Sequence, residues 1–487
     1  MERSQGGGEP ERRESLAALR ERGVDPYPRR AERTHTAAEV ASEYERLEGV
    51  RVAVCGRVTA IRRHGKAGFA DVTDASGKIQ VYTRKDDLDE EVFAVWTLVD
   101  VGDIVGAEGE VMKTRTGEVT VKVSGLTVLA KALRALPEKW HGLRDIELRS
   151  RHRYLDLIAN EESRSVFLAR SRILAVARQF LAERGFIEVE TPVLQPIYGG
   201  AFAKPFVTDH HALGMPLYLR IADELYLKRL IVGGIERVFE IGKDFRNEGT
   251  DRTHSPEFTQ LELYQAYSDY RGMMEIAESL FVRLARDLTD GTTITWQGTE
   301  IDLSPPWRRL TVTEAIRSAV GDVDLGDAEA LAERAESAGL EVERPVDPAA
   351  LAERILAELV EPTLVEPTFL VDYPRAISPL AKATEGDPEI VERFEIFVGG
   401  LELGNSFTEL NDPDEQRRRF ELQQAARELG DEEAHGMDDD FLRALEHGMP
   451  PTGGLGIGVD RLVMLLTDAR HIRDVILFPV MRPEEGR

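Results

Sequence analysis

Cysteine is almost missing from this sequence: Cys55 is the only one among 487 residues. A single thiol cannot form an intramolecular disulfide, which excludes a disulfide-stapled secreted scaffold and favours a cytoplasmic protein. The surrounding segment VAVCG supplies small and apolar neighbours. We therefore expect a small buried side chain at this position, without a nucleophilic role.

Long apolar segments are missing as well, and basic residues are outnumbered by acidic ones. No run of about 18 apolar residues is present, so we expect no membrane-spanning helix. The charged N-terminus MERSQGGGEPERRE lacks the apolar core of a secretory signal. A formal net charge of −26 argues against indiscriminate nucleic-acid binding, so a nucleic-acid partner would need local basic patches.

The composition that remains is typical of a multidomain α+β protein. Hydrophobic residues make up 42% and charged residues 31%, and the length suggests two to four domains of about 150 residues each. Thr36 is a plausible cap for a helix over 37–47. The predicted parts are a helical extension (1–49), a small β domain (50–131), a charged hinge (132–160) and a large domain (161–487).

The small β domain shows period-two alternation from Val50 onward. Five strand-like segments with a helical segment between the third and fourth are typical of a five-stranded OB-fold β-barrel. The predicted strands are 51–62, 68–73, 78–83, 103–113 and 118–129, and the predicted helix is 87–98. Such barrels commonly bind oligonucleotides across their second and third strands.

The expected binding face of this barrel carries an aromatic and an amide side chain. Phe69 offers a stacking plane for an unpaired base, and Gln80 can read a base edge. Basic side chains placed to contact phosphates are Arg57, Arg62, Arg63, His64 and Lys66. The alternative is that Phe69 packs under a loop and that the basic residues are only solvated.

The large domain begins with a long amphipathic helix over 161–184, which Gly185 ends as a C-cap. A strand over 186–190 follows and stops before Pro192. This helix and strand fit a subunit interface, and core packing fits them equally well. Further along, Ala/Glu/Leu-rich helices over about 311–360 indicate an inserted helical subdomain without chemistry of its own.

The stretch from Phe239 to Tyr270, containing FRNEGTDRTHSPEFTQLELYQAY, reads as two strands joined by a polar loop. Alternation groups Glu240, Asp244 and Arg246 on one face of the first strand, and Phe258, Gln260, Glu262 and Tyr264 on one face of the second. A face that combines charges with aromatic rings is suited to a charged, planar ligand. A half-exposed hairpin with solvated charges is the alternative.

The stretch RFEIFVGGLELGNSFTEL contains Gly399-Gly400, a strong signal for a two-residue hairpin turn. With that turn, Phe397 opposes Glu402, and Glu395 becomes a diagonal neighbour of Glu402 at roughly 7–8 Å. Two carboxylates at this separation repel unless a cation lies between them, and magnesium accepts such oxygen ligands together with substrate phosphates. A coincidental pair of surface acids is the weaker interpretation.

The stretch GGLGIGVDRLVMLL lacks the third glycine of a dinucleotide fingerprint. It reads as a glycine-rich strand that runs into an apolar helix beginning at Asp460-Arg461. Arginine at a helix start opposes the helix dipole, so a phosphate group is a suitable partner for it.

Glu224 lies in the first turn of another predicted helix, where pairing with the helix dipole is the simplest role for a glutamate.

Together these stretches resemble the three signature motifs of class II aminoacyl-tRNA synthetases. The helix and strand ending at Thr191-Pro192 are similar to the dimer-forming first motif, FRNEG…HSPEFTQLE to the second and GLGIGVDR to the third. The OB-fold narrows the likeness to the aspartate, asparagine and lysine subgroup, and GGLELGNSFTELND, RIADELYLKRL and RDVILFPVMRP are similar to bacterial lysyl-tRNA synthetases. The resemblance implies that residues 161–487 form a class II catalytic domain built on an antiparallel sheet.

The resemblance also implies roles for individual residues. Arg246 and Arg461 would be catalytic. The ATP-binding residues would be Arg246, Glu248, His254, Phe258, Glu395, Glu402 and Arg461, with Mg²⁺ on Glu395 and Glu402. The lysine-binding residues would be Gly200, Glu224, Arg246, Glu262, Tyr264, Asn405, Phe407 and Glu409, and the anticodon contacts would be Phe69, Gln80 and Glu118. Ser255 and Lys204 depart from the commoner Asn and Arg, which affects the expected affinity more than the activity.

The implied reaction joins L-lysine to tRNA(Lys) through a lysyl-adenylate, with release of pyrophosphate and AMP, in a cytoplasmic homodimer. It needs positioning and charge stabilisation more than an enzyme nucleophile. A cationic side chain taken from water needs paired carboxylates, which Glu224 and Glu409 would supply. The competing interpretations are a sister enzyme for aspartate or asparagine and a non-enzymatic OB-fold binding protein.

Glu409→Gln tests the assignment of the lysine pocket. We expect the variant to weaken lysine use far more than ATP binding, because it removes one carboxylate partner of the ammonium group. The measurement is the KM for lysine in pyrophosphate exchange beside nucleotide binding without lysine. Equal losses in both would contradict the assignment.

Overall fold

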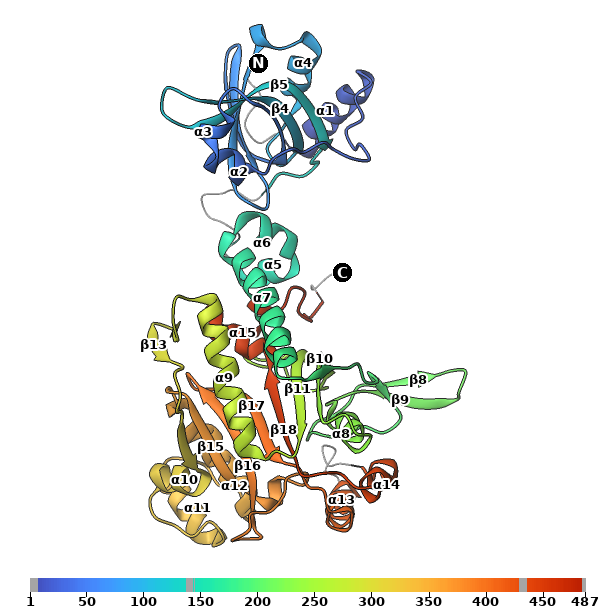
Figure 1. Cartoon of the computed structure of the whole chain (residues 1–487), viewed down its shortest axis with the longest axis vertical. Helices are drawn as coiled ribbons and strands as arrows, with labels where there is room; N and C mark the ends of the chain where they lie inside the picture. Colours follow the sequence, from blue (N-terminus) through green and yellow to red (C-terminus); the bar gives the residue numbers. More distant parts are fainter. Residues whose placement is uncertain (1–7, 137–142, 144, 429–435, 484–487) are drawn as a thin grey trace. The chain divides into compact units, whose positions relative to one another are not determined.

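The computed structural model describes residues 8–136, 143, 145–428 and 436–483. The chain folds into two compact units, Met1–Arg144 and Asp145–Arg487, each with its own hydrophobic core (Figure 1). Within the described residues, no helix combines the length and the apolar character needed to cross a membrane.

The first unit is a closed barrel in which the strands follow the order β1-β2-β3-β5-β4. Its strands are β1 (Arg51–His64), β2 (Ala67–Thr73), β3 (Lys78–Arg84), β4 (Ile104–Lys113) and β5 (Val119–Ala130). The helix α4 (Glu90–Leu98) lies between the third and fourth strands in the chain. The predicted five-stranded OB-fold is therefore confirmed, with strand ends within a few residues of the expected ones.

The N-terminal helices belong to the same unit as the barrel. Helix α1 (Glu9–Glu21) contributes the buried Leu19 to the barrel core. Thr36 caps α2 (Ala37–Ser42) in a full capping box, as expected from its position. The helix predicted over 37–47 is broken, however, and continues as the separate α3 (Tyr44–Leu47).

The predicted hinge lies partly outside the described residues, at 137–142 and 144. Beyond it, two short helices, α5 (Ile146–Arg151) and α6 (Arg153–Ala159), belong to the second unit. The guanidinium of Arg153 is buried, pairs with Asp156 at 2.6 Å and donates to the carbonyl oxygens of Arg473 and Leu477. These bonds attach the α5–α6 segment to the C-terminal part of the second unit.

The second unit is built on an eight-stranded sheet with the order β14-β15-β16-β17-β18-β11-β10-β6. Its strands are β6 (Ile187–Glu188), β10 (Arg237–Phe245), β11 (Glu257–Ala266), β14 (Arg308–Thr311), β15 (Thr368–Pro374), β16 (Ile390–Val398), β17 (Leu401–Thr408) and β18 (Thr452–Gly458). All neighbours from β15 to β10 pair antiparallel, and the two edge pairs are parallel. The predicted strand at 186–190 is reduced to the two residues of β6.

One face of this sheet is covered by three helices, α7 (Glu161–Glu183), α9 (Tyr270–Leu288) and α15 (Val459–Thr467) (Figure 1). Leu261 and Leu263 of β11 point into this core, as their alternation predicts. Asp460 joins the layers, since it accepts hydrogen bonds from Arg170 of α7 and from the backbone N–H of Thr259.

Smaller elements surround the opposite, polar face of the sheet. They are the helix α8 (Glu224–Val232), the helices α13 (Pro413–Glu428) and α14 (Asp439–Glu446), and the sheet β7-β9-β8 (Leu194–Gln195, Met215–Leu219, Val207–His210). The short helix α16 (Ile472–Val475) and the hairpin β12–β13 (Thr293–Trp296, Thr299–Asp302) pack instead into the core under α7, α9 and α15. The expected helical insertion is present as α10 (Val312–Val320), α11 (Ala328–Ser337) and α12 (Pro348–Ile355), and these helices share a core with β15 and β16.

Gly109→Ala tests a close backbone approach in the barrel. The β4–β5 ladder shifts register at Gly109, and a Cβ there would lie 1.9 Å from the carbonyl oxygen of Lys122. We expect the variant to lose about 1–3 kcal/mol of stability in the first unit. Hydrogen-exchange protection of the barrel amides measures the loss. Gly125→Ala is the matched control, because its Cβ would make only ordinary contacts at 3.6 Å or more; equal losses in both variants would contradict the steric explanation.

Candidate active site

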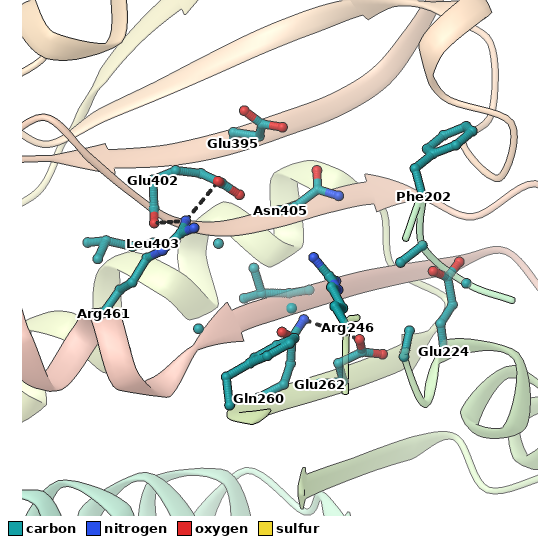
Figure 2. Close-up of a pocket in the computed structure, with 18 of the residues that line it drawn as sticks. Phe202, Glu224, Arg246, Gln260, Glu262, Glu395, Glu402, Leu403, Asn405 and Arg461 are labelled. Atoms are coloured by element: carbon teal, nitrogen blue, oxygen red, sulfur yellow. Dashed lines mark hydrogen bonds and ion pairs between the residues drawn. The ribbon is translucent and has the colours of Figure 1, made fainter. Parts of the chain in front are cut away.

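A cavity of about 330 Å³ opens on the polar face of the large sheet. Its walls come from the hairpins β10–β11 and β16–β17, the glycine strand β18 and the first turn of α8 (Figure 2). Glu402 and Arg461 lie at one end of it, Glu224 lies at the other, and Arg246 lies between them (Figure 2). The cavity therefore brings together the three stretches that the sequence singled out.

The second strand of the central hairpin presents its polar face to the cavity, as predicted. The residues of β11 that line it on this face are Phe258, Gln260, Glu262 and Tyr264. The guanidinium of Arg246, just after β10, lies 5.0 Å from the centre of the Phe258 ring. This cation–π contact keeps a flat, positively charged surface in the middle of the cavity.

The first strand of the hairpin differs from the prediction. Glu240 and Asp244 are buried below the cavity and do not line it. Both pair with the buried Arg220, at 2.6 Å and 3.0 Å respectively. Gly242 makes room for this arginine, because a Cβ at that position would lie 1.8 Å from a guanidinium nitrogen.

A cluster of buried carboxylates lies next to this arginine. Asp223, Asp244 and Glu262 each place one oxygen within 4.8 Å of the others. Burial raises the pKa of Asp223 to about 6 and the pKa of Asp244 to about 7, and burial together with Asp223 raises the pKa of Glu262 well above its usual range. Burial and mutual repulsion therefore oppose the full ionisation of this cluster.

The turn at Gly399-Gly400 forms as predicted, with positive φ at both glycines and Phe397 opposite Glu402. Beyond this pair the ladder shifts register, so that Glu395 pairs with Asn405. This shift is a β-bulge, which the regular ladder assumed in the sequence analysis did not include. Both carboxylates nevertheless face the cavity, because the strand keeps its alternation with Phe394 and Ile396 in the opposite core.

The two acids of this hairpin are already held by neighbouring groups. Glu395 accepts hydrogen bonds from the hydroxyl of Tyr373 and from Arg393, both at 2.7 Å. Burial raises the pKa of Glu395. Burial has the same effect on Glu402, but the guanidinium of Arg461, 2.9 Å away, outweighs it and lowers the pKa of Glu402 below its usual range.

Glu395 and Glu402 fit a magnesium ion by the chemistry of their donors. Two carboxylates of neighbouring strands face one cavity, and each keeps lone pairs beyond its present hydrogen bonds. A third acid that the sequence analysis missed, Glu361, adds negative charge: burial, followed by Glu395 and Glu402, raises its pKa to about 7. A cation at this end would relieve the repulsion among the three carboxylates.

The predicted phosphate ligands meet at the same end of the cavity. Arg461 bonds to the backbone oxygen and the carboxylate of Glu402, and lies 2.8 Å from Nε2 of His254. The other ring nitrogen of His254 lies 2.8 Å from Asp251. Glu248 lines the cavity nearby. Asp251, which sequence reasoning missed, thus orients the predicted histidine.

At the opposite end, Glu224 and Glu409 converge as predicted. Both carboxylates contact the ammonium group of the buried Lys228, at 2.5 Å for Glu224. Sequence reasoning missed this lysine, although it follows Glu224 by one helical turn. Gly454 is required beside them, since a Cβ there would lie 2.1 Å from Oε1 of Glu409. Gly200, Asn405 and Phe407 complete this end of the cavity.

In the barrel, the expected nucleic-acid face is only partly available. Phe69 is half-buried against Tyr82, with ring centres 4.8 Å apart, and Gln80 accepts a hydrogen bond from the hydroxyl of Thr120. Glu118 is exposed at the start of the neighbouring β5.

Most of the basic cluster beside this face is engaged within the chain. Arg57 and Arg63 donate to backbone carbonyl oxygens, Arg62 pairs with Asp71 and Lys66 pairs with Asp86. Contact of these four residues with phosphates stays a prediction, and it would have to replace or share these bonds.

Glu361→Gln tests the repulsion among the acids. Because the folded pKa of Glu361 is raised from 4.5 to about 7, its carboxyl destabilises the fold increasingly as the pH rises across that window. Without magnesium, we expect the variant to have a higher Tm than the parent at a pH of about 8, and the difference to vanish below a pH of about 4.5. Glu366→Gln, at an exposed glutamate of the same segment, is the control. A difference that does not change with pH would contradict the explanation.

Comparisons with known proteins agree with this geometry. The family described as tRNA synthetases class II (D, K and N) matches residues 145–482, and the OB-fold nucleic acid binding domain family matches residues 52–129. Lysine–tRNA ligase of Moorella thermoacetica is 54% identical over 476 residues, covering 97% of each chain. Lysine–tRNA ligases of a Thermoanaerobacter species and of Chloroflexus aurantiacus are 53% and 51% identical, covering 97% of this chain and 95% and 97% of their own. The chain therefore belongs to the class II tRNA synthetases of the aspartate, lysine and asparagine group.

Proposed function

We propose that this protein ligates L-lysine to tRNA(Lys) at the expense of ATP, through a lysyl-adenylate. The observation that carries the proposal is the charge layout of one cavity, which has carboxylates for an ammonium group at one end and cationic groups for phosphates at the other. Membership of the family and the identity of more than half of the positions with a curated lysine–tRNA ligase support it.

ATP would bind across the middle and the phosphate end of the cavity. Phe258 lines the cavity and would stack on the adenine ring, while Glu248 would accept from the adenine amino group. His254 and Arg461 would hold the outer phosphates. Mg²⁺ on Glu395 and Glu402 would supply charge neutralisation of the phosphates when bound.

Lysine would bind with its carboxylate toward Arg246 and its side chain toward Glu224 and Glu409. Glu262, which accepts a hydrogen bond from the hydroxyl of Tyr264 at 3.1 Å, is placed for the α-amino group. Burial leaves the two glutamates poorly solvated, so a cationic side chain gains most by contacting them from the cavity. An anionic side chain would meet repulsion in the same place.

The chemistry would proceed by two displacements. A carboxylate oxygen of lysine attacks the α-phosphorus of ATP, the bond from this phosphorus to the bridging oxygen breaks, and pyrophosphate leaves with the electron pair. Arg246 would stabilise the charge on the α-phosphate, and Arg461 with His254 the charge on the leaving group. A terminal ribose hydroxyl of the tRNA then attacks the lysyl carbonyl carbon, AMP leaves, and the hydroxyl proton is released to solvent.

The barrel would hold the anticodon. Phe69 and Tyr82 form an aromatic surface on which an unpaired base can stack, while Gln80 and Glu118 offer polar groups on the same side. Because the net charge of the chain is −26, the tRNA would be recognised by local contacts and not by a general attraction.

We also propose that the chain works as a cytoplasmic homodimer. Exposed apolar side chains recur between β6 and β8, at Ile187, Val193, Leu194, Ile197 and Val207. Such a group of exposed apolar residues is typical of a protein interface. The single cysteine is consistent with a reducing compartment.

Pyrophosphate exchange across a panel of amino acids tests the proposed function. We expect lysine to support exchange, and aspartate and asparagine to support at most about one-hundredth of that rate, because the buried glutamates repel an anionic side chain and gain no cation from a neutral one. Arg461→Gln should lose at least about 100-fold of the lysine-dependent rate. Exchange driven by aspartate or asparagine would instead assign the chain to a sister enzyme, and exchange with none would refute the proposal.

A further inference from the structure

Lys228, which the sequence analysis missed, contacts both acids of the predicted lysine pocket. Lys228 of α8 is fully buried, and its ammonium group contacts one oxygen of Glu224 and one oxygen of Glu409. The same ammonium lies 5.2 Å from the centre of the Phe407 ring. One cation of the chain therefore contacts both acids at the closed end of the cavity.

The two carboxylates face the cavity, while the lysine lies behind them. Glu224, Glu409 and Phe407 line the cavity, and Lys228 is not among the described residues that do so. Oε1 of Glu409 is buried without a hydrogen-bond partner among the described residues, and it lies where a side chain at Gly454 would be. The acid pair thus keeps a free acceptor in addition to its contacts with Lys228.

Burial raises the pKa of Glu224 and of Glu409, and the ammonium group of Lys228 opposes that rise. With both carboxylates ionised, the two carboxylates and the ammonium group in direct contact together carry one negative charge. One further cation therefore makes the site neutral. Burial opposes the charge on Lys228, yet Glu224 and Glu409 outweigh burial and raise its pKa above the ordinary value. Without this lysine, two buried carboxylates would share a proton, and their affinity for a cation would change with that proton.

We propose that Lys228 is a specificity-determining residue, a resident cation that leaves the Glu224–Glu409 pair with a single negative charge for the ammonium group of the substrate. This inference rests on the proposed function. The pocket then accepts one cationic side chain and rejects neutral side chains, because only a cation completes the charge balance. Lys228 acts through the two carboxylates and does not itself touch the substrate.

A double-mutant cycle tests this role. In Glu409→Gln, Glu224 and Lys228 neutralise each other, so we expect kcat/KM for lysine to fall by about 100-fold. Adding Lys228→Met to that variant frees Glu224 for the substrate and should restore kcat/KM at least about tenfold. A purely structural lysine predicts the opposite, namely a double variant no better than Glu409→Gln. Arg229→Met is the matched control, because its ion pairs with Asp438 and Asp440 lie outside the cavity.

A second readout uses Glu409→Gln alone and does not require any change at Lys228. The ratio of kcat/KM for lysine to that for norleucine, which has the same four side-chain carbons and no ammonium group, should fall by at least about tenfold, since the remaining pair is neutral. An unchanged ratio would refute the role of Lys228. Thermal unfolding and ATP binding without lysine confirm that each variant is folded.

The outcomes separate this inference from the proposed function. If the parent protein gives no lysine-dependent pyrophosphate exchange, the proposed function fails. If the parent is active while the double variant recovers nothing and the norleucine ratio stays constant, the function stands and the role of Lys228 is wrong.

Discussion

Buried charge must be balanced, and this constraint shapes both units of the protein. A carboxylate taken out of water is tolerated only next to a cation, a hydrogen-bond donor or a proton. In the large unit the requirement is met by pairs between distant segments, such as Arg220 with Glu240 and Arg461 with Glu402. In the barrel the ammonium group of Lys131 lies between Asp100 and Asp103 in the same manner. The pairs of the large unit join segments that form the walls of the cavity.

The sheet provides the frame on which these charges are arranged. Its strands give alternate side chains to two environments, with Leu261 and Leu263 under the covering helices and Gln260 and Glu262 toward the cavity. The glycines of β18 carry no side chains and therefore leave space between the two hairpins that β18 joins. At Gly454, for example, a Cβ would lie 2.1 Å from Oε1 of Glu409. A side chain at that glycine would displace one of the two acids on which recognition of an ammonium group would depend.

Local patterns predicted much of this arrangement, because they depend on neighbours in the chain. Alternation in QLELY identified the cavity face of β11, and two adjacent glycines identified the β16–β17 turn. The capping box at Thr36 and the barrel strands follow from the same local rules. The bulge that pairs Glu395 with Asn405 was not predicted, because it depends on how β17 packs between β16 and β18. The burial of Asp244 below the cavity was missed for a similar reason, since Arg220 reaches it from another segment.

Periodicity and turn chemistry act over a few residues, and they predict the order of the elements, the barrel, the helical insertion and the strand face of most candidate residues. Tertiary structure alone decided which charges become partners. Glu224 and Glu409 come from a helix and a strand end far apart in the chain, and nothing in either segment indicates that both would contact Lys228. Pairing of this kind depends on how the whole domain packs, because only packing removes the water that would otherwise solvate each charge separately.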